Sequence, residues 1–134
     1  MRVFVGITGA SGSIYAERLI AELLAKEIPR IYICVSDTAK KVIEHELAKP
    51  NPQISDKKFL LRNILANNLT NKQKNIIRIF SADNFFSPVA SGSSAATHTI
   101  IIPCSMGCLA RIRSGISSNL IERVADVALK QKNQ

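Results

Sequence analysis

Residues 2–24 read RVFVGITGASGSIYAERLIAELL. The β-branched and aromatic side chains of residues 2–8 predict a strand, the small residues 9–12 predict a tight turn, and the apolar residues that follow recur at helical spacing. The same order of strand and helix returns over residues 31–35 and 36–47. Strands that alternate with helices form parallel sheets. We therefore expect an α/β fold with three layers and a Rossmann-like or flavodoxin-like parallel sheet.

The rest of the chain continues this pattern with less regular connections. Residues 48–75 predict a loop, one amphipathic helix and a second polar loop, and residues 76–80 predict a third strand. Residues 81–96 are small and irregular, as in a loop that lines a site. Residues 99–103 predict an apolar strand buried on both faces, and residues 119–130 predict a helix that opens with a capping-box pattern. A chain of 134 residues with this pattern predicts a single domain.

The composition is that of an ordinary globular protein with an excess of positive charge. The chain has 18 Lys and Arg against 10 Asp and Glu, which gives a formal net charge of +8. A basic surface attracts nucleic acids, membranes or phosphorylated ligands. Aromatic residues make up only 5% of the chain, too few for a surface on which bases stack. We therefore expect no nucleic-acid partner.

Membrane insertion and export are not predicted either. The longest apolar stretch, residues 100–104, is far shorter than the roughly 20 residues of a membrane-spanning helix. The N-terminal segment contains glycines where a signal peptide keeps an unbroken apolar run. Cys34, Cys104 and Cys108 are too few for a disulfide framework, so we expect core thiols in a cytoplasmic protein. They are not accompanied by a cluster of His or further Cys, so no metal site is expected.

Glycines and hydroxyl side chains gather where predicted strands end. The turn 9–12 directs backbone N–H groups at any anion beside it, although its glycines fit neither the dinucleotide fingerprint nor the P-loop. Ser36 and Ser105 follow two other strands, and residues 91–94 form a serine-rich loop. Open α/β sheets bind ligands at the carboxyl ends of their strands, so this pattern favours a phosphorylated cofactor such as FMN. The alternative is a tight turn that packs helix on sheet, with serines that only cap helices.

Two cations lie on one face of the last predicted helix. Arg123 and Lys130 are seven residues apart, which gives them nearly the same azimuth. Asp126 stands within reach of both, so an exposed ladder of ion pairs is the alternative to a phosphate site. Glu46, on the second predicted helix, has the pattern of an exposed surface residue.

Taken together, these motifs resemble a known family. From residue 1 to about residue 131 the chain is similar to UbiX-type flavin prenyltransferases. The Ser-Gly-Ser-Ser loop and the last helix are specific to that branch of the flavoproteins. The matching motifs are Gly9-Ala10-Ser11-Gly12 with Tyr15 and Arg18, Val35-Ser36, Glu46, Ala90-Ser91-Gly92-Ser93-Ser94-Ala95, Pro103-Cys104-Ser105-Met106-Gly107, and residues 119–130.

The resemblance implies an activity, a cofactor and partners. The family transfers a dimethylallyl group from dimethylallyl monophosphate to reduced FMN without a metal, and the prenylated FMN serves UbiD-type decarboxylases. It also implies a homo-oligomer with FMN between subunits. The cofactor-binding residues that the resemblance implies are Gly9, Ala10, Ser11, Ser36, Ser105, Met106, Gly107, Cys108 and Arg123. The catalytic residues that it implies are Glu46, Ser91, Arg123 and Lys130.

Two other functions stay open. The same superfamily includes flavin-dependent cysteinyl decarboxylases, and a non-catalytic FMN-binding fragment is the second alternative. Family members continue beyond the segment that matches the last helix, with a further strand and more phosphate-binding residues. We therefore expect residues 1–134 to form one flavoprotein domain that is shortened at its C-terminal end relative to the family.

Overall fold

The computed structural model describes residues 1–47, 59–60, 64–65, 69–92 and 96–131. Strands and helices alternate along the chain, as the sequence predicts. In chain order the elements are β1 (Val3–Ile7), α1 (Ser13–Ala25), β2 (Ile31–Val35), α2 (Asp37–Leu47), α4 (Asn71–Ile76), β3 (Ile77–Ser81), the 3-10 turn η1 (Pro88–Ala90), β4 (His98–Ile101), α5 (Met106–Arg113) and α6 (Leu120–Gln131).

The four strands form one parallel sheet in the order β3-β2-β1-β4. β1 lies between its neighbours, so that Val5 pairs with Ile33 of β2 on one side and with Ile100 of β4 on the other. This order is that of a Rossmann half-sheet, in which the winding direction reverses next to β1. Ligands of such sheets bind at the carboxyl ends of the strands beside the reversal. The loops that follow β1 and β4 are therefore where a site is expected.

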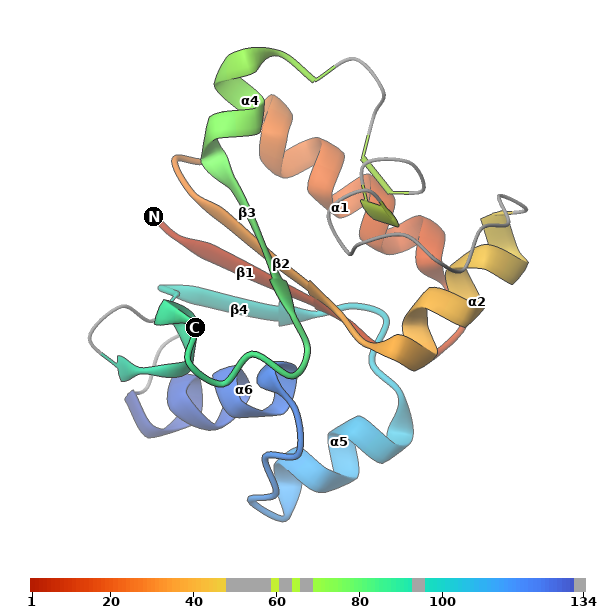
Figure 1. Cartoon of the computed structure of the whole chain (residues 1–134), viewed down its shortest axis with the longest axis vertical. Helices are drawn as coiled ribbons and strands as arrows, with labels where there is room; N and C mark the ends of the chain where they lie inside the picture. Colours follow the sequence, from red (N-terminus) through yellow and green to blue (C-terminus); the bar gives the residue numbers. More distant parts are fainter. Residues whose placement is uncertain (48–58, 61–63, 66–68, 93–95, 132–134) are drawn as a thin grey trace.

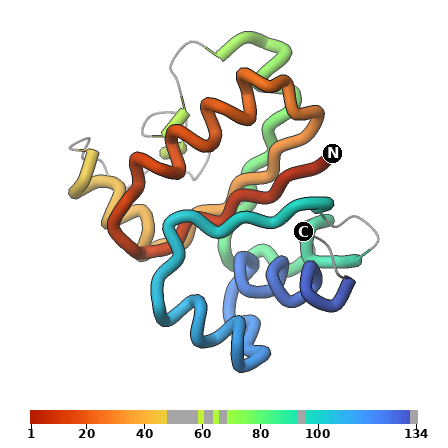
Figure 2. Tube along the Cα trace, turned by 180° about the vertical axis from the view of Figure 1, so that it is seen from behind, coloured from red at the N-terminus to blue at the C-terminus, as the bar shows by residue number. Residues whose placement is uncertain are grey.

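Helices cover both faces of the sheet, which confirms the three-layer α/β prediction (Figures 1 and 2). The side chains of β1 alternate between the faces, as they must in a strand. Val3, Val5 and Ile7 pack in the core beneath α1 and α2, whereas Phe4 packs in a second core with Leu120, Ile121 and Val124 of α6. At Gly6, which points toward α6, an added Cβ would lie 2.7 Å from Ile121 Cγ2. A glycine there lets α6 approach the sheet.

Residues 69–81 differ from the sequence prediction. The predicted polar loop contains the short helix α4, and the strand runs from Ile77 to Ser81 instead of from residue 76 to 80. Thr70 begins α4 with a capping box, because its hydroxyl accepts a hydrogen bond from Gln73 N while the Gln73 side chain accepts one from Thr70 N. This Thr-x-x-Gln pattern was present in the sequence. Most of the predicted helix after residue 48 lies outside the described residues.

Burial also differs from the prediction in β4 and at one cysteine. β4 is an edge strand of the described sheet, and all four of its residues are only half-buried. It is therefore not the doubly buried strand that its apolar sequence predicts. Cys34 and Cys108 are buried, as expected of core thiols, but Cys104 is exposed. In the part of the chain that the structure covers, no helix has both the length and the apolar character needed to cross a membrane.

Candidate ligand site at the carboxyl edge of the sheet

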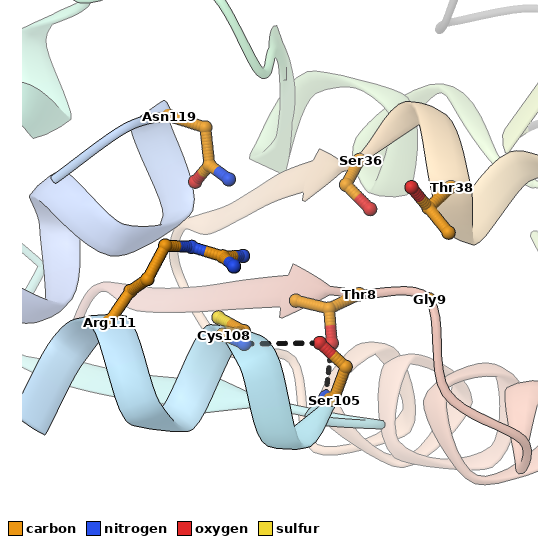
Figure 3. A pocket seen from close by; sticks show the side chains of 8 residues that line it. All are labelled: Thr8, Gly9, Ser36, Thr38, Ser105, Cys108, Arg111 and Asn119. Atoms are coloured by element: carbon orange, nitrogen blue, oxygen red, sulfur yellow. Dashed lines mark hydrogen bonds between the residues drawn. The ribbon is translucent and has the colours of Figure 1, made fainter. Parts of the chain in front are cut away.

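A cavity of about 120 Å³ opens where β1, β2 and β4 end (Figure 3). Its position beside β1 is the one that the reversal in strand order predicts. Ligand pockets for whole drug-sized molecules measure roughly 300–1,000 Å³, so this cavity has room for only one end of such a molecule. The residues that line it are Thr8, Gly9, Ser36, Thr38, Ser105, Cys108, Arg111 and Asn119.

Thr8 joins the two loops on either side of the cavity. Its hydroxyl donates a hydrogen bond of 2.8 Å to the carbonyl of Pro103 and accepts one of 2.7 Å from Ser105 N. The Thr8 side chain is buried, so both bonds are sheltered from water. A single threonine at the end of β1 thereby fixes the position of the loop that follows β4.

Ser36 and Ser105 cap the helices that begin at the cavity. Ser36 Oγ accepts a hydrogen bond of 3.1 Å from Ala39 N at the start of α2, and Ser105 Oγ accepts one of 3.3 Å from Cys108 N at the start of α5. Both serines are therefore helix caps, as the simpler interpretation of the sequence has it. Because capping uses an oxygen lone pair, each hydroxyl keeps its hydrogen to donate. The same two side chains offer donors to an acceptor in the cavity.

The glycine-rich turn is shaped by packing against α2. An added Cβ at Gly9 would lie 2.8 Å from Thr38 Cβ, so only glycine allows this close approach. Ala10 N donates to Thr8 O at 2.9 Å, and Gly12 has φ +108°, in the left-handed region that favours glycine. Gly9 lines the cavity, whereas Ala10 folds back on Thr8.

Glu46 occupies the N-terminus of α1. Its carboxylate accepts hydrogen bonds from Gly12 N at 3.0 Å and Ser13 N at 2.8 Å. The Ser13 hydroxyl beside the carboxylate, together with the N–H groups of Ser13 and Gly12, lowers the pKa of Glu46 to about 2. Ser11 and Glu46 line a separate, open hollow beside the cavity, and Thr38 borders both. The anion at this helix N-terminus is thus supplied by the chain itself.

Arg123 and its neighbours lie outside the residues that line the cavity. Arg123 Nη1 forms the predicted ion pair with Asp126 at 3.1 Å, and Arg123 Nε donates to the carbonyl of Ala90 at 3.3 Å. The second bond places the arginine beside the loop that contains Ser91. Lys130 is exposed in the last turn of α6. The structure thus brings Arg123 to Ala90, next to Ser91, but not to the cavity between β1 and β4.

The motifs did not point to Arg111, the one charged residue among the eight described residues that line the cavity. Arg111 stands four residues after Gly107 and three after Cys108, so on a helix it shares a face with them. This spacing was the signal in the sequence that could have pointed to Arg111. Arg111 Nε donates to Glu122 Oε1 at 2.8 Å. Burial alone would raise the pKa of Glu122, but hydrogen bonds from Ser118 and Arg111 outweigh it and leave the pKa lowered.

The other predicted residues surround the start of α5. Met106 and Gly107 are exposed in its first turn, and Cys108 is buried at the cavity wall. Burial raises the pKa of the Cys108 thiol to about 11, so it is neutral at physiological pH. Among the described residues, no three His, Cys, Asp or Glu side chains lie together in a way that would hold a metal ion.

The fold is that of a class of flavoproteins. The chain belongs to the Flavoprotein family, whose model matches residues 1–134.

Its relatives are named as flavin prenyltransferases. The chain is 38% identical over 134 residues to flavin prenyltransferase UbiX of Methanocaldococcus jannaschii, covering 100% of this chain and 62% of the relative. It is 39% identical over 131 residues to flavin prenyltransferase UbiX of Chlamydia muridarum, covering 98% of this chain and 61% of the relative. The chain thus spans about three fifths of the length of these relatives.

Solved structures with the same fold include proteins of that type. A crystal structure of AnUbiX (PadA1) in complex with FMN and dimethylallyl pyrophosphate has a TM-score of 0.76 and 28% identity, covering 98% of this chain and 60% of the other. A dodecameric FMN-dependent Ubix-like decarboxylase from Escherichia coli O157:H7 has a TM-score of 0.78 and 29% identity, covering 100% and 63%.

Proposed function

We propose that residues 1–134 form one flavoprotein domain that binds FMN and belongs to a flavin prenyltransferase. The observation that carries the proposal is a cavity of hydroxyl donors at the carboxyl ends of β1 and β4, in a chain 38% identical to a UbiX flavin prenyltransferase. The substrate is dimethylallyl monophosphate. Its dimethylallyl group is transferred to reduced FMN, and inorganic phosphate leaves.

The cavity suits the phosphate end of FMN. Ser36 and Ser105 each keep a hydroxyl hydrogen to donate, and Arg111 adds a cation. A phosphate monoester carries close to two negative charges at neutral pH and takes such donors. The volume of about 120 Å³ fits the phosphate and the adjoining part of the ribityl chain, and leaves the ring outside.

The predicted cofactor-binding residues form two groups, according to the part of FMN that they contact. Gly9, Ser36, Ser105 and Cys108 contact its phosphate end, since they line the cavity. Ala10 and Ser11 lie in the turn after β1, Met106 and Gly107 in the first turn of α5, and Arg123 on α6, where they contact the ribityl chain and the ring.

Leaving-group stabilisation is the role that we assign to the two cations of α6. Reduced FMN, when bound, supplies the nucleophilic nitrogen that accepts the dimethylallyl group. Arg123 and Lys130 bind the phosphate that departs from the substrate, and fixed cations at a developing negative charge lower the barrier. Ser91, beside Arg123, donates a hydrogen bond to the same group. Glu46 has its pKa lowered to about 2, which favours a hydrogen-bond acceptor over a store of protons at neutral pH.

The oligomeric state, the partner protein and the cellular compartment follow from the same proposal. We infer a homo-oligomer with FMN between subunits, because Arg123 and Ser91 are not among the residues that line the cavity and a second copy would bring the two parts together. A UbiD-type decarboxylase receives the prenylated FMN. Three cysteines, too few for a disulfide framework, fit the reducing cytoplasm.

Flavin titration tests the cofactor, and a mass measurement tests the reaction. The chain is titrated with FMN, FAD and NAD while flavin fluorescence or heat is recorded. It is then incubated anaerobically with reduced FMN and dimethylallyl monophosphate, and the flavin is analysed by mass spectrometry. We expect FMN to bind most tightly and its mass to rise by one dimethylallyl group. Binding of FAD or NAD tenfold tighter than FMN, which corresponds to about 1.4 kcal/mol, would refute the cofactor assignment.

A further inference from the structure

Arg111 reaches the cavity from the side opposite β2. Figure 3 shows its side chain leaving α5 and directing the guanidinium into the space between Asn119, Ser36 and Thr8. Ser36, Ser105 and Thr8 contribute neutral hydroxyls to this space. Arg111 is therefore the residue that brings charged N–H donors to the cavity wall.

The guanidinium is anchored from behind by a buried carboxylate. Arg111 Nε donates to Glu122 Oε1 at 2.8 Å, and the Glu122 side chain is 0% exposed. Glu122 is itself held in place, because Oε2 accepts hydrogen bonds from Ser118 N at 2.8 Å and from Ser118 Oγ at 2.6 Å. Asn119 Nδ2 adds a longer bond to Oε1. A carboxylate fixed at both oxygens sets the orientation of the arginine bound to it.

The terminal nitrogens of Arg111 remain available to a ligand. A guanidinium has five N–H donors in a planar fork, and the bond to Glu122 uses the one on Nε. Within the described residues, no hydrogen bond of Nη1 or Nη2 to a protein acceptor is present. Nη1 lies close to the first turn of α5, where an added Cβ on Gly107 would be 3.2 Å away. Glycine at position 107 therefore leaves room for the fork.

An arrangement of this kind recognises phosphate. Arg–phosphate hydrogen bonds are charge-assisted and often bidentate, which adds both strength and orientation. The charges of Arg111 and Glu122 cancel, so the pair has no net charge. The attraction of phosphate to this pair therefore comes more from directed N–H donors at short range than from a long-range electrostatic field. The cavity thus distinguishes a ligand that ends in phosphate from the same ligand that ends in a hydroxyl.

We propose that Arg111 binds the terminal phosphate of FMN and gives the site its preference for FMN over riboflavin. This assignment rests on the proposed FMN-binding function and names a further residue of that site. Glu122 is its positioning residue, since it holds the guanidinium but lies behind it.

The experiment compares FMN with riboflavin, which lacks only the phosphate. Arg111→Met keeps the apolar stem and removes the N–H fork, and Arg111→Lys keeps the charge and the partner of Glu122. Arg113→Met is the matched control, because Arg113 is an exposed arginine of the same helix outside the cavity lining. Dissociation constants for both flavins are measured by fluorescence, and folding is checked by circular dichroism.

We expect Arg111→Met to weaken FMN binding at least tenfold and to leave riboflavin binding unchanged, because a hydrogen bond to a charged group is lost. Arg111→Lys should weaken FMN binding by a smaller factor, and Arg113→Met should change neither flavin. If Arg111→Met fails to fold, the FMN-to-riboflavin ratio of Arg111→Lys decides: an unchanged ratio overturns the proposal.

Two further outcomes also overturn it. Equal weakening of FMN and riboflavin would make Arg111 a structural residue, and unchanged FMN binding would remove it from the site. Failure of the proposed function looks different, because the unmodified chain would then bind FAD or NAD at least tenfold more tightly than FMN.

Discussion

Replacement of Glu122 by Gln should destabilise the chain by about 3 kcal/mol. The carboxylate is fully buried and accepts four hydrogen bonds, from Arg111 Nε, Ser118 N, Ser118 Oγ and Asn119 Nδ2. A Gln amide has one acceptor oxygen, so its NH₂ group must face either Arg111 Nε or Ser118 N, both of which only donate. One buried donor is then left unsatisfied, which costs about 1–3 kcal/mol, and two charge-assisted bonds become neutral ones.

The environment of Arg111 places the expected loss at the lower end of the range for broken buried ion pairs, which is about 3–5 kcal/mol. Its side chain is 42% exposed, so water solvates the guanidinium once the carboxylate is gone. Urea unfolding at pH 7, followed by circular dichroism, measures the loss. Glu22→Gln is the matched control, because Glu22 is an exposed residue of α1 whose replacement should cost less than about 0.5 kcal/mol. Equal midpoints for the two variants would refute the reasoning.

Two further predictions concern titration and thiol reactivity. The pKa of Glu46 is lowered to about 2 from its ordinary 4.5, so its stabilising effect is fully present above pH 4.5 and is lost progressively as the pH falls from 4.5 to about 2. An NMR titration of its carboxyl carbon should have its midpoint near pH 2, and a midpoint near 4.5 would contradict the capping of α1. Cys104 is exposed while Cys34 and Cys108 are buried, and the pKa of Cys108 is raised to about 11. A thiol reagent at pH 8 should therefore modify one cysteine rapidly, and Cys104→Ser should abolish this phase. A rapid phase that persists in that variant would contradict the burial of the other two.

Local signals were sufficient for most of the described secondary structure. The strand over residues 31–35 is found with its predicted bounds, since a β-branched run ends at a helix-capping serine. The last helix begins one residue after Asn119, whose side chain accepts the hydrogen bond of Glu122 N. α4 was missed, although its capping box is local, because its polar sequence lacks an apolar face.

The parts of the site that sequence could not predict depend on contacts between distant elements. Glu46 meets the N-terminus of α1 across 34 positions of the chain, where an incoming anion had been expected. Arg111 enters the cavity because α5 packs against α6, which places Glu122 behind it. Ser36 and Ser105 were predictable because each lies between the end of a strand and the start of a helix. Residues at strand ends are placed by topology alone, whereas residues on helices need the packing of those helices.

The pairing of β1 with β4 bears on the order in which the molecule folds. Thr8 and Pro103, which meet across this pairing, are 95 residues apart in the chain, whereas the strands β1, β2 and β3 follow one another more closely. Closing a longer loop costs more chain entropy, so the β1–β4 contact is the last that we expect to form. The cavity exists only after that step. A ligand held there would then slow unfolding while leaving the rate of folding nearly unchanged, because the transition state precedes the site to which it binds.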